Sequence, residues 1–363
     1  MKPSRAILGR VSPMGAHFSI LAGVACAFLL GILDAEGQSA WSPHVLSTSL
    51  DGHLIAIAAP GGKVCVWDAK SRRLAHSFVA GKAVKAVSIT QAGDAICCGA
   101  GNAEGKAEVD FWDLKPDGPS LRWKAPINEQ ANAVAISWDS KWIAAVTPAA
   151  TIRFFDADRG QLRKTLRERG NEMLTCAFLP KRFALATGGQ TLRLWDLQRA
   201  GLRVDSIEAS SPSESEYIAR ERDSLVSSLG SMATSLCVAP NGKWIAAIGS
   251  FHASSQGRPE NLVLVDQRSG KLAKTLASRL DDVKCLAAAP DSEKLAVVFD
   301  DGRLEIWNVV RAERARLVRT GIHNARAGVF VGSPDVLAIA DAEGNVEVWD
   351  VSRSAKLYGF KAG

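Results

Sequence analysis

Histidine and paired aspartate are the residues of this chain that could bind a metal ion or perform acid–base chemistry. The histidines beyond residue 40 are isolated in the sequence, and no two have the spacing of a metal-ligand pair: His44, His53, His76, His252 and His323. Asp281-Asp282 and Asp300-Asp301 fall at the ends of expected strands, where carboxylates usually stabilise turns. The sequence also contains no nucleophile elbow, phosphate loop or dinucleotide fingerprint. We therefore expect no catalytic residue, no metal site and no cofactor.

Cysteine is the other candidate for reactive or structural chemistry. Six cysteines follow the first forty residues: Cys65, Cys97, Cys98, Cys176, Cys237 and Cys285. An even number in an exported protein is compatible with disulfides, but most of these residues fall within expected strands of different repeats. Because cysteine packs well as a small apolar side chain, we interpret them as buried structural residues.

Composition narrows the class of partner. An apolar content of 47% supports a large core. The net charge of +6 is spread over 363 residues without a dense Lys/Arg stretch, so a nucleic-acid partner is not expected. Basic residues that recur in turns, such as Arg199 and Arg353, are interpreted as solvated surface.

One strand-like pattern recurs seven times, an apolar alternation that ends in an aromatic or apolar residue followed by Asp or Asn. Its final pairs are Trp67-Asp68, Trp112-Asp113, Phe155-Asp156, Trp195-Asp196, Val265-Asp266, Trp307-Asn308 and Trp349-Asp350. Five of the six intervals between them measure 40–45 residues, and the sixth, of 70, contains an insertion at 207–231. This period is typical of a four-stranded propeller blade.

Each repeat has the same internal order of strands and turns. A turn such as Asp51-Gly52 precedes a strand that is apolar on both faces, such as 54–59, and a fourth strand follows the Asp. We therefore predict an all-β fold, a seven-bladed β-propeller of four-stranded antiparallel blades over residues 41–363.

These repeats resemble the WD-repeat family from Trp41 to Gly363. The resemblance implies that each Trp lies on a third strand and packs between blades, while the Asp begins the next turn. The Gly-His pair of that family is nearly absent, and Gly81-Lys82 and Gly321-Ile322-His323 are its nearest equivalents. Apolar packing must then provide more of the stability. The chain ends on a fourth-strand candidate, Lys356 to Phe360, so the sequence leaves open how the ring closes.

The first forty residues predict a signal peptide or an N-terminal membrane anchor. Lys2, Arg5 and Arg10 precede a run of sixteen uncharged residues, 18–33, which is shorter than the roughly 20 that span a bilayer. We expect an exported protein, periplasmic or on the extracytoplasmic face of a membrane, with a cytoplasmic location as the alternative. Membrane contact is expected only through this segment if it stays uncleaved, and the propeller itself is expected to be monomeric.

Three long loops interrupt the repeats, at 99–106, 207–231 and 249–260. In a propeller they emerge on the same face, and the last two adjoin blades four and five. This predicts a partner-binding rim whose candidate residues are Tyr217, Arg220, Arg222, Phe251, His252 and Arg258. We therefore expect a non-catalytic scaffold for protein–protein interaction. The alternatives are an insertion that the fold tolerates without a role, and an exported propeller enzyme or quinone- or ligand-binding propeller with its site in the central channel.

Overall fold

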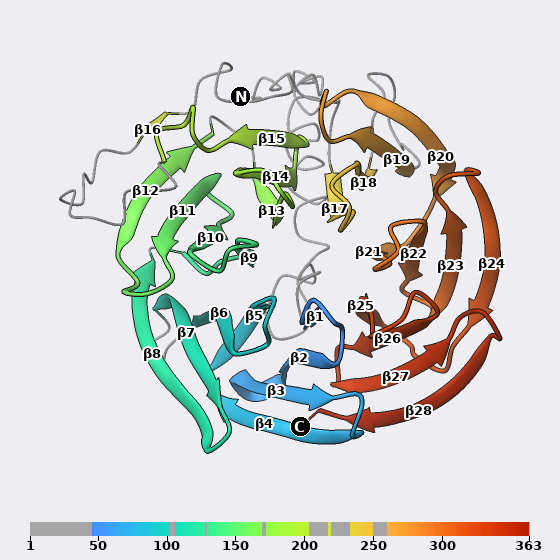
Figure 1. Cartoon of the computed structure of the whole chain (residues 1–363), viewed down its shortest axis with the longest axis horizontal. Helices are drawn as coiled ribbons and strands as arrows, with labels where there is room; N and C mark the ends of the chain where they lie inside the picture. The colour runs from blue at the N-terminus through green and yellow to red at the C-terminus, as the bar shows by residue number, and fades with distance from the viewer. Residues whose placement is uncertain are drawn as a thin grey trace, which may run out of the picture. The chain divides into compact units, whose positions relative to one another are not determined.

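The predicted all-β propeller is confirmed by a computed structural model. It describes residues 46–101, 106–127, 129–168, 172–202, 217–218, 233–249 and 260–362. Within the unit formed by Ser42–Gly363, the strands form seven sheets around a common centre (Figure 1). Among the residues just given, no helix is long and apolar enough to span a membrane.

Each blade runs outward from the centre in chain order, with antiparallel neighbours. Blade one contains β1 (Leu46–Thr48), β2 (Leu54–Ala59), β3 (Lys63–Asp68) and β4 (Arg73–Val79), with a 3-10 turn, η1 (Pro60–Gly62), before β3. Blades two and three contain β5 (Ala83–Ile89), β6 (Ala95–Gly101), β7 (Ala107–Lys115), β8 (Gly118–Ile127), β9 (Ala133–Ile136), β10 (Trp142–Val146), β11 (Thr151–Asp156) and β12 (Leu162–Arg167). Blades four and five contain β13 (Met173–Phe178), β14 (Ala184–Gly189), β15 (Arg193–Asp196), β17 (Ala233–Val238), β18 (Trp244–Gly249), β19 (Glu260–Asp266) and β20 (Leu272–Leu280). Blades six and seven contain β21 (Val283–Ala288), β22 (Lys294–Phe299), β23 (Arg303–Asn308), β24 (Glu313–Arg319), β25 (Ala325–Phe330), β26 (Val336–Asp341), β27 (Asn345–Asp350) and β28 (Ala355–Lys361).

Two blades differ from the regular number of four strands, and one loop differs from its expected length. In blade four the described residues supply three strands, β13 to β15. In blade three a fifth strand, β16 (Tyr217–Ile218), pairs parallel with Leu166–Arg167 of β12 and comes from the insertion. In blade two β6 and β7 extend to Gly101 and Ala107, so the loop predicted at 99–106 is shorter than expected.

Strand register shows that the seven repeats are equivalent. The residue that precedes each Asp or Asn pairs with an Ile or Leu on the second strand: Trp67 with Ile55, Trp112 with Ile96, Phe155 with Ile143, Trp195 with Leu185, Val265 with Ile245, Trp307 with Leu295 and Trp349 with Leu337. The next residue of the second strand is fully buried in every blade: Ala56, Cys97, Ala144, Ala186, Ala246, Ala296 and Ala338. Close packing at this position admits only a small side chain, so Cys97 occupies an alanine position.

The apolar core lies between neighbouring blades. One cluster joins Trp142 and Phe154 of blade three to Trp195 of blade four, whose indole is fully buried. Another joins Leu304 of blade six to Leu337 of blade seven. Burying one such large side chain contributes about 1.5–3 kcal/mol, so each blade depends on its neighbours for stability.

Among the described residues, the first and last blades share no strand where the ring closes. Blade one consists of β1 to β4 and blade seven of β25 to β28, and the two sheets pack face to face (Figure 1). The rings of Trp67 and Phe360 stack with centroids 3.9 Å apart and an interplanar angle of 6°. The Arg72 guanidinium lies 4.9 Å from the centroid of the Tyr358 ring. Side-chain packing therefore provides the closure that the sequence left open.

Candidate functional site

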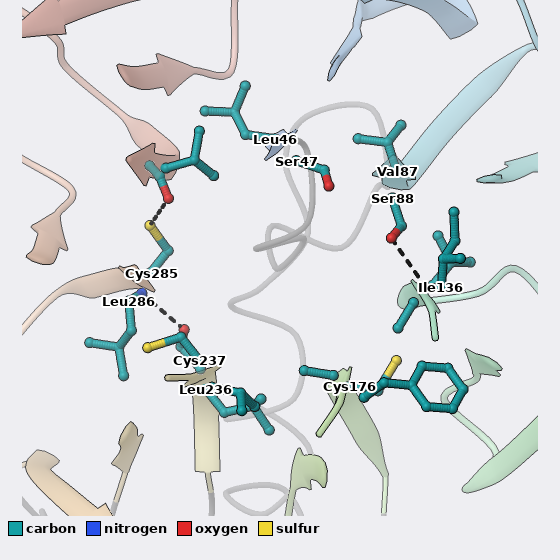
Figure 2. Close-up of a pocket in the computed structure, with 18 of the residues that line it drawn as sticks. Leu46, Ser47, Val87, Ser88, Ile136, Cys176, Leu236, Cys237, Cys285 and Leu286 are labelled. Atoms are coloured by element: carbon teal, nitrogen blue, oxygen red, sulfur yellow. Dashed lines mark hydrogen bonds between the residues drawn. The ribbon is translucent and has the colours of Figure 1, made fainter. Parts of the chain in front are cut away.

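The first strands of all seven blades surround a central channel (Figure 2). Its cavity of about 270 Å³ is lined by one or more apolar residues from every blade, among them Leu46, Val87, Ile136, Phe178, Leu236, Leu286 and Val329. These strands end in short turns, so their side chains are held by the rigid sheets behind them. The lining residues are uncharged, and the cavity can accommodate water or a small apolar group.

Three serine hydroxyls of the channel wall are used by the fold. Each accepts a hydrogen bond from a backbone N–H of the next blade, an arrangement drawn in part in Figure 2. The bonds are Ile89 N to Ser47 Oγ at 3.1 Å, Ile136 N to Ser88 Oγ at 3.3 Å and Leu286 N to Ser235 Oγ at 3.3 Å. These hydroxyls therefore link neighbouring blades.

Three cysteines of adjacent blades also border the channel, Cys176, Cys237 and Cys285. Burial raises the pKa of the Cys285 thiol to about 12 and raises those of Cys176 and Cys237 well above the usual thiol pKa. These thiols are protonated near neutral pH and are poor nucleophiles. All six cysteines beyond the first forty residues are free, and all but the half-buried Cys237 are buried, as the sequence predicted. Within the described part of the chain, no group of three or more potential ligands is placed to hold a metal ion.

The Asp or Asn of each repeat organises the turn after the third strand. Its side-chain oxygen accepts a backbone N–H three residues later in six of seven blades: Asp68 from Ser71, Asp156 from Arg159, Asp196 from Arg199, Asp266 from Ser269, Asn308 from Arg311 and Asp350 from Arg353. In the remaining blade Asp113 forms an ion pair with Arg122. Satisfying turn N–H groups in this way is the usual role of Asp and Asn.

A glutamate two residues before the Trp serves a role that the sequence reasoning missed. Glu305 accepts the Trp307 indole N–H at 3.0 Å and pairs with Arg314 at 2.6 Å. Blade seven repeats this arrangement with Glu347, Trp349 at 2.9 Å and Lys356 at 2.6 Å. The sequence signal for this arrangement is the glutamate in LEIWN and VEVWD, which faces the same side of the strand as the Trp two residues later.

Electrostatics favour the ionised form of this glutamate in blade seven. Burial alone would raise the pKa of Glu347, but hydrogen bonds from Lys356, the Trp349 indole and the Gly321 backbone N–H outweigh it and lower that pKa. The Glu–indole–cation arrangement thus satisfies the indole N–H of the repeat Trp in two blades that lack the Gly-His pair.

Blade two has Asp110 at the equivalent position, and there the effect of burial on the pKa outweighs that of the neighbouring cation. Its carboxylate is fully buried, and one oxygen lies 3.1 Å from the Lys124 ammonium, which also pairs with Glu108 at 2.9 Å. Burial raises the pKa of Asp110 to about 6 because the shared lysine only partly compensates it.

Residues that flank the two long loops lie at the same end of the blade-five strands β17, β18 and β19. Ala233, which follows the insertion, pairs with Gly249, the last residue of β18. Gly249 in turn pairs with Asn261 at the beginning of β19. The end of the insertion and both ends of the 249–260 loop are therefore neighbours. Of the candidate rim residues, Tyr217 belongs to β16, which pairs with β12 at the outer edge of blade three, so the structure does not place it beside the blade-five anchors. Arg220, Arg222, Phe251, His252 and Arg258 lie outside the described residues.

The basic turns of the opposite face pair with the aspartates of their own turns. Arg199 Nε lies 3.7 Å from Asp196 and Arg353 Nε lies 3.6 Å from Asp350, with both arginine side chains largely exposed. Such exposed pairs contribute little energy. The geometry agrees with the interpretation of these residues as solvated surface.

Comparison with known proteins agrees with this fold. Residues 270–308, from the fourth strand of blade five to the third strand of blade six, match the family model "WD domain, G-beta repeat". The other blades share the strand register of this repeat, so the repeat that the family model matches recurs around the whole ring.

Two relatives show how distant the similarity is. The chain is 23% identical over 233 residues to autophagy-related protein 16 of Arabidopsis thaliana, which covers 61% of this chain and 39% of that protein. It therefore matches about two fifths of the length of this relative. A chain in the crystal structure of the mitotic checkpoint complex superposes with a TM-score of 0.66 at 15% identity, covering 85% of this chain and 90% of that one. This likeness shows the fold.

Proposed function

We propose that this chain is a non-catalytic scaffold that binds protein partners through the rim formed by residues 207–231 and 249–260. The observation that supports the proposal is the strand register of blade five, which brings Ala233, just after the first segment, beside Gly249 and Asn261 at the two ends of the second. WD-repeat propellers are typically protein-interaction scaffolds, and loops on a rigid framework commonly carry binding.

Side chains of the types that dominate interface energetics occur in these two segments. Tyr217, Arg220 and Arg222 lie in the first, and Phe251 and Arg258 in the second. The relatives named above do not identify the partner.

Deletion of residues 208–230 tests the proposal. We expect the variant to keep its melting temperature and to lose the partners that the intact protein captures from the cell envelope. The matched control is Arg199→Ala with Arg353→Ala, which alters the opposite face and should leave the partners unchanged. An unchanged set of partners after the loop deletion would refute the rim proposal. If the deletion variant does not fold, the double variant Arg220→Ala with Arg258→Ala replaces it in the same experiment.

We also propose that the propeller acts outside the cytoplasm. The support is the uncharged run of sixteen residues at 18–33 behind a basic flank. Fractionation of native cells, followed by N-terminal sequencing of the purified protein, distinguishes a cleaved leader, an uncleaved anchor and a cytoplasmic protein.

A second candidate function is binding of a small uncharged ligand, such as a quinone, in the channel. The uncharged lining and the cavity of about 270 Å³ favour it, as does Trp138 on the wall, whose fluorescence would report binding. Saturable quenching by a soluble quinone, abolished by Ala135→Phe in a protein with unchanged melting temperature, would support it. Linear quenching without saturation would reject it.

A further inference from the structure

The outer strands of the blades have a strongly one-sided charge. The six fourth strands that the structure describes, β4, β8, β12, β20, β24 and β28, carry thirteen Lys or Arg residues and one acidic residue, Glu313. They form the perimeter of the ring (Figure 1). Edge strands expose unpaired backbone N–H and C=O groups that can pair with another strand. Like charge on these fourth strands disfavours edge-to-edge pairing between two copies of this protein.

One of these edges shows how a further strand can be added. Strand β16 pairs parallel with β12, where Leu166 is opposite Tyr217 and Arg167 is opposite Ile218. The sequence just before β16 is Ser-Glu-Ser-Glu, residues 213–216, whereas β12 has three basic residues and no acid. In blade three a basic edge thus pairs with a strand that follows an acidic segment.

Strand β24 of blade six has the same character and has no fifth strand among the described residues. Every residue of β24 except Val318 is exposed, and it carries Arg314, Arg316 and Arg319. Arg314 pairs inward with the buried Glu305. Arg316 forms no ion pair or hydrogen bond with any residue that the structure describes. Beside it, Leu317 is 44% exposed and offers an apolar contact.

We infer that β24 is a docking edge for an extended acidic segment of a partner protein, which adds a fifth strand to blade six by β-augmentation. Backbone hydrogen bonds would provide the pairing, while Arg316 and Leu317 would select acidic and apolar side chains on the added strand. This surface belongs to the outer edge of blade six and is separate from the loop rim, so either proposal can fail while the other stands.

The test uses the full chain and a fluorescent peptide with the sequence of residues 211–219, SPSESEYIA. We expect saturable anisotropy at about 0.05 M salt, weakened by added salt. A peptide with both glutamates replaced by lysine should not bind. Arg316→Glu should weaken binding by roughly five-fold or more, since it replaces an attractive cross-strand pair with a repulsive one.

Lys274→Glu is the matched control. Lys274 pairs with Leu264 as Arg316 pairs with Ile306, so the two residues occupy equivalent positions on the outer strands of blades five and six. This variant should bind within about two-fold of the parent. Hydrogen exchange should show new protection of β24 amides when the acidic peptide is added. The inference is overturned if the peptide does not bind, or if Arg316→Glu and Lys274→Glu lose affinity equally. It is also overturned if the peptide binds without protecting the β24 amides, or if these amides are protected in a dimer without peptide.

Discussion

Asp110→Asn is the substitution whose effect the structure defines best. The Asp110 carboxylate is fully buried, and Lys124, the cation that pairs with it, is 38% exposed and shared with Glu108. Burial therefore dominates and raises the pKa of Asp110 from 3.8 to about 6. The folded chain holds this proton more tightly than the unfolded chain does.

The sign of the pH dependence follows from that difference. Between the unfolded value of 3.8 and the folded value of about 6, unfolding releases a proton. The contribution of Asp110 to stability therefore falls as the pH rises through this window, and it stays constant at higher pH. One pKa unit corresponds to about 1.4 kcal/mol, so ionising Asp110 in the folded chain costs about 3 kcal/mol. Asparagine removes this cost and keeps a similar shape.

We expect Asp110→Asn to be more stable than the parent by about 1–3 kcal/mol near pH 8, and to differ little from it near pH 4. Urea unfolding at the two pH values measures this difference. Asp113→Asn is the matched control on the same strand, because Asp113 is partly exposed and paired with Arg122, and no gain is expected. A variant that is less stable than the parent by the same amount at both pH values would refute the reasoning.

Three further predictions concern the blades and their closure. Trp307→Ala should lower the melting temperature sharply, since truncating a buried aromatic ring costs about 3–5 kcal/mol, and an unchanged calorimetric midpoint would contradict the blade assignment. Phe360→Ala should loosen the seam between blades one and seven, seen as faster proteolysis, whereas Leu357→Ala, half-exposed on the same strand, should not. Asp350→Asn should destabilise the protein at neutral pH and have a smaller effect as the pH falls below 3.8, because hydrogen bonds led by that from the Ser352 hydroxyl lower the pKa of Asp350; equal destabilisation across the pH range would contradict this.

The fold could be predicted because its signal repeats along the chain. Each Trp-Asp pair is a local pattern of alternation followed by a turn residue, and these properties depend on neighbours in sequence. Val265-Asp266 was found without a Trp because the spacing and the Asp were preserved, and its register matches the other blades.

The Glu–indole–cation arrangement was not predicted, although all three residue types are visible in the sequence. Glu305 and Arg314 come together only when β23 and β24 pair with a bulge after Ile306, and register is set by the whole sheet. For the expected rim residues, the structure describes the strand ends on either side of the loops and not the side chains within them.

The sequence by itself determined seven strand units, their length and their turns, because backbone alternation and Asp-stabilised turns are local properties. Only the tertiary structure decided how the ring closes, which hydroxyls join the blades and which carboxylates are buried. Trp67 stacks on Phe360, nearly three hundred residues away in the sequence, because the last blade must pack on the first for both to bury their apolar faces. Such contacts depend on the geometry of the closed ring, which the pattern within any one repeat does not contain.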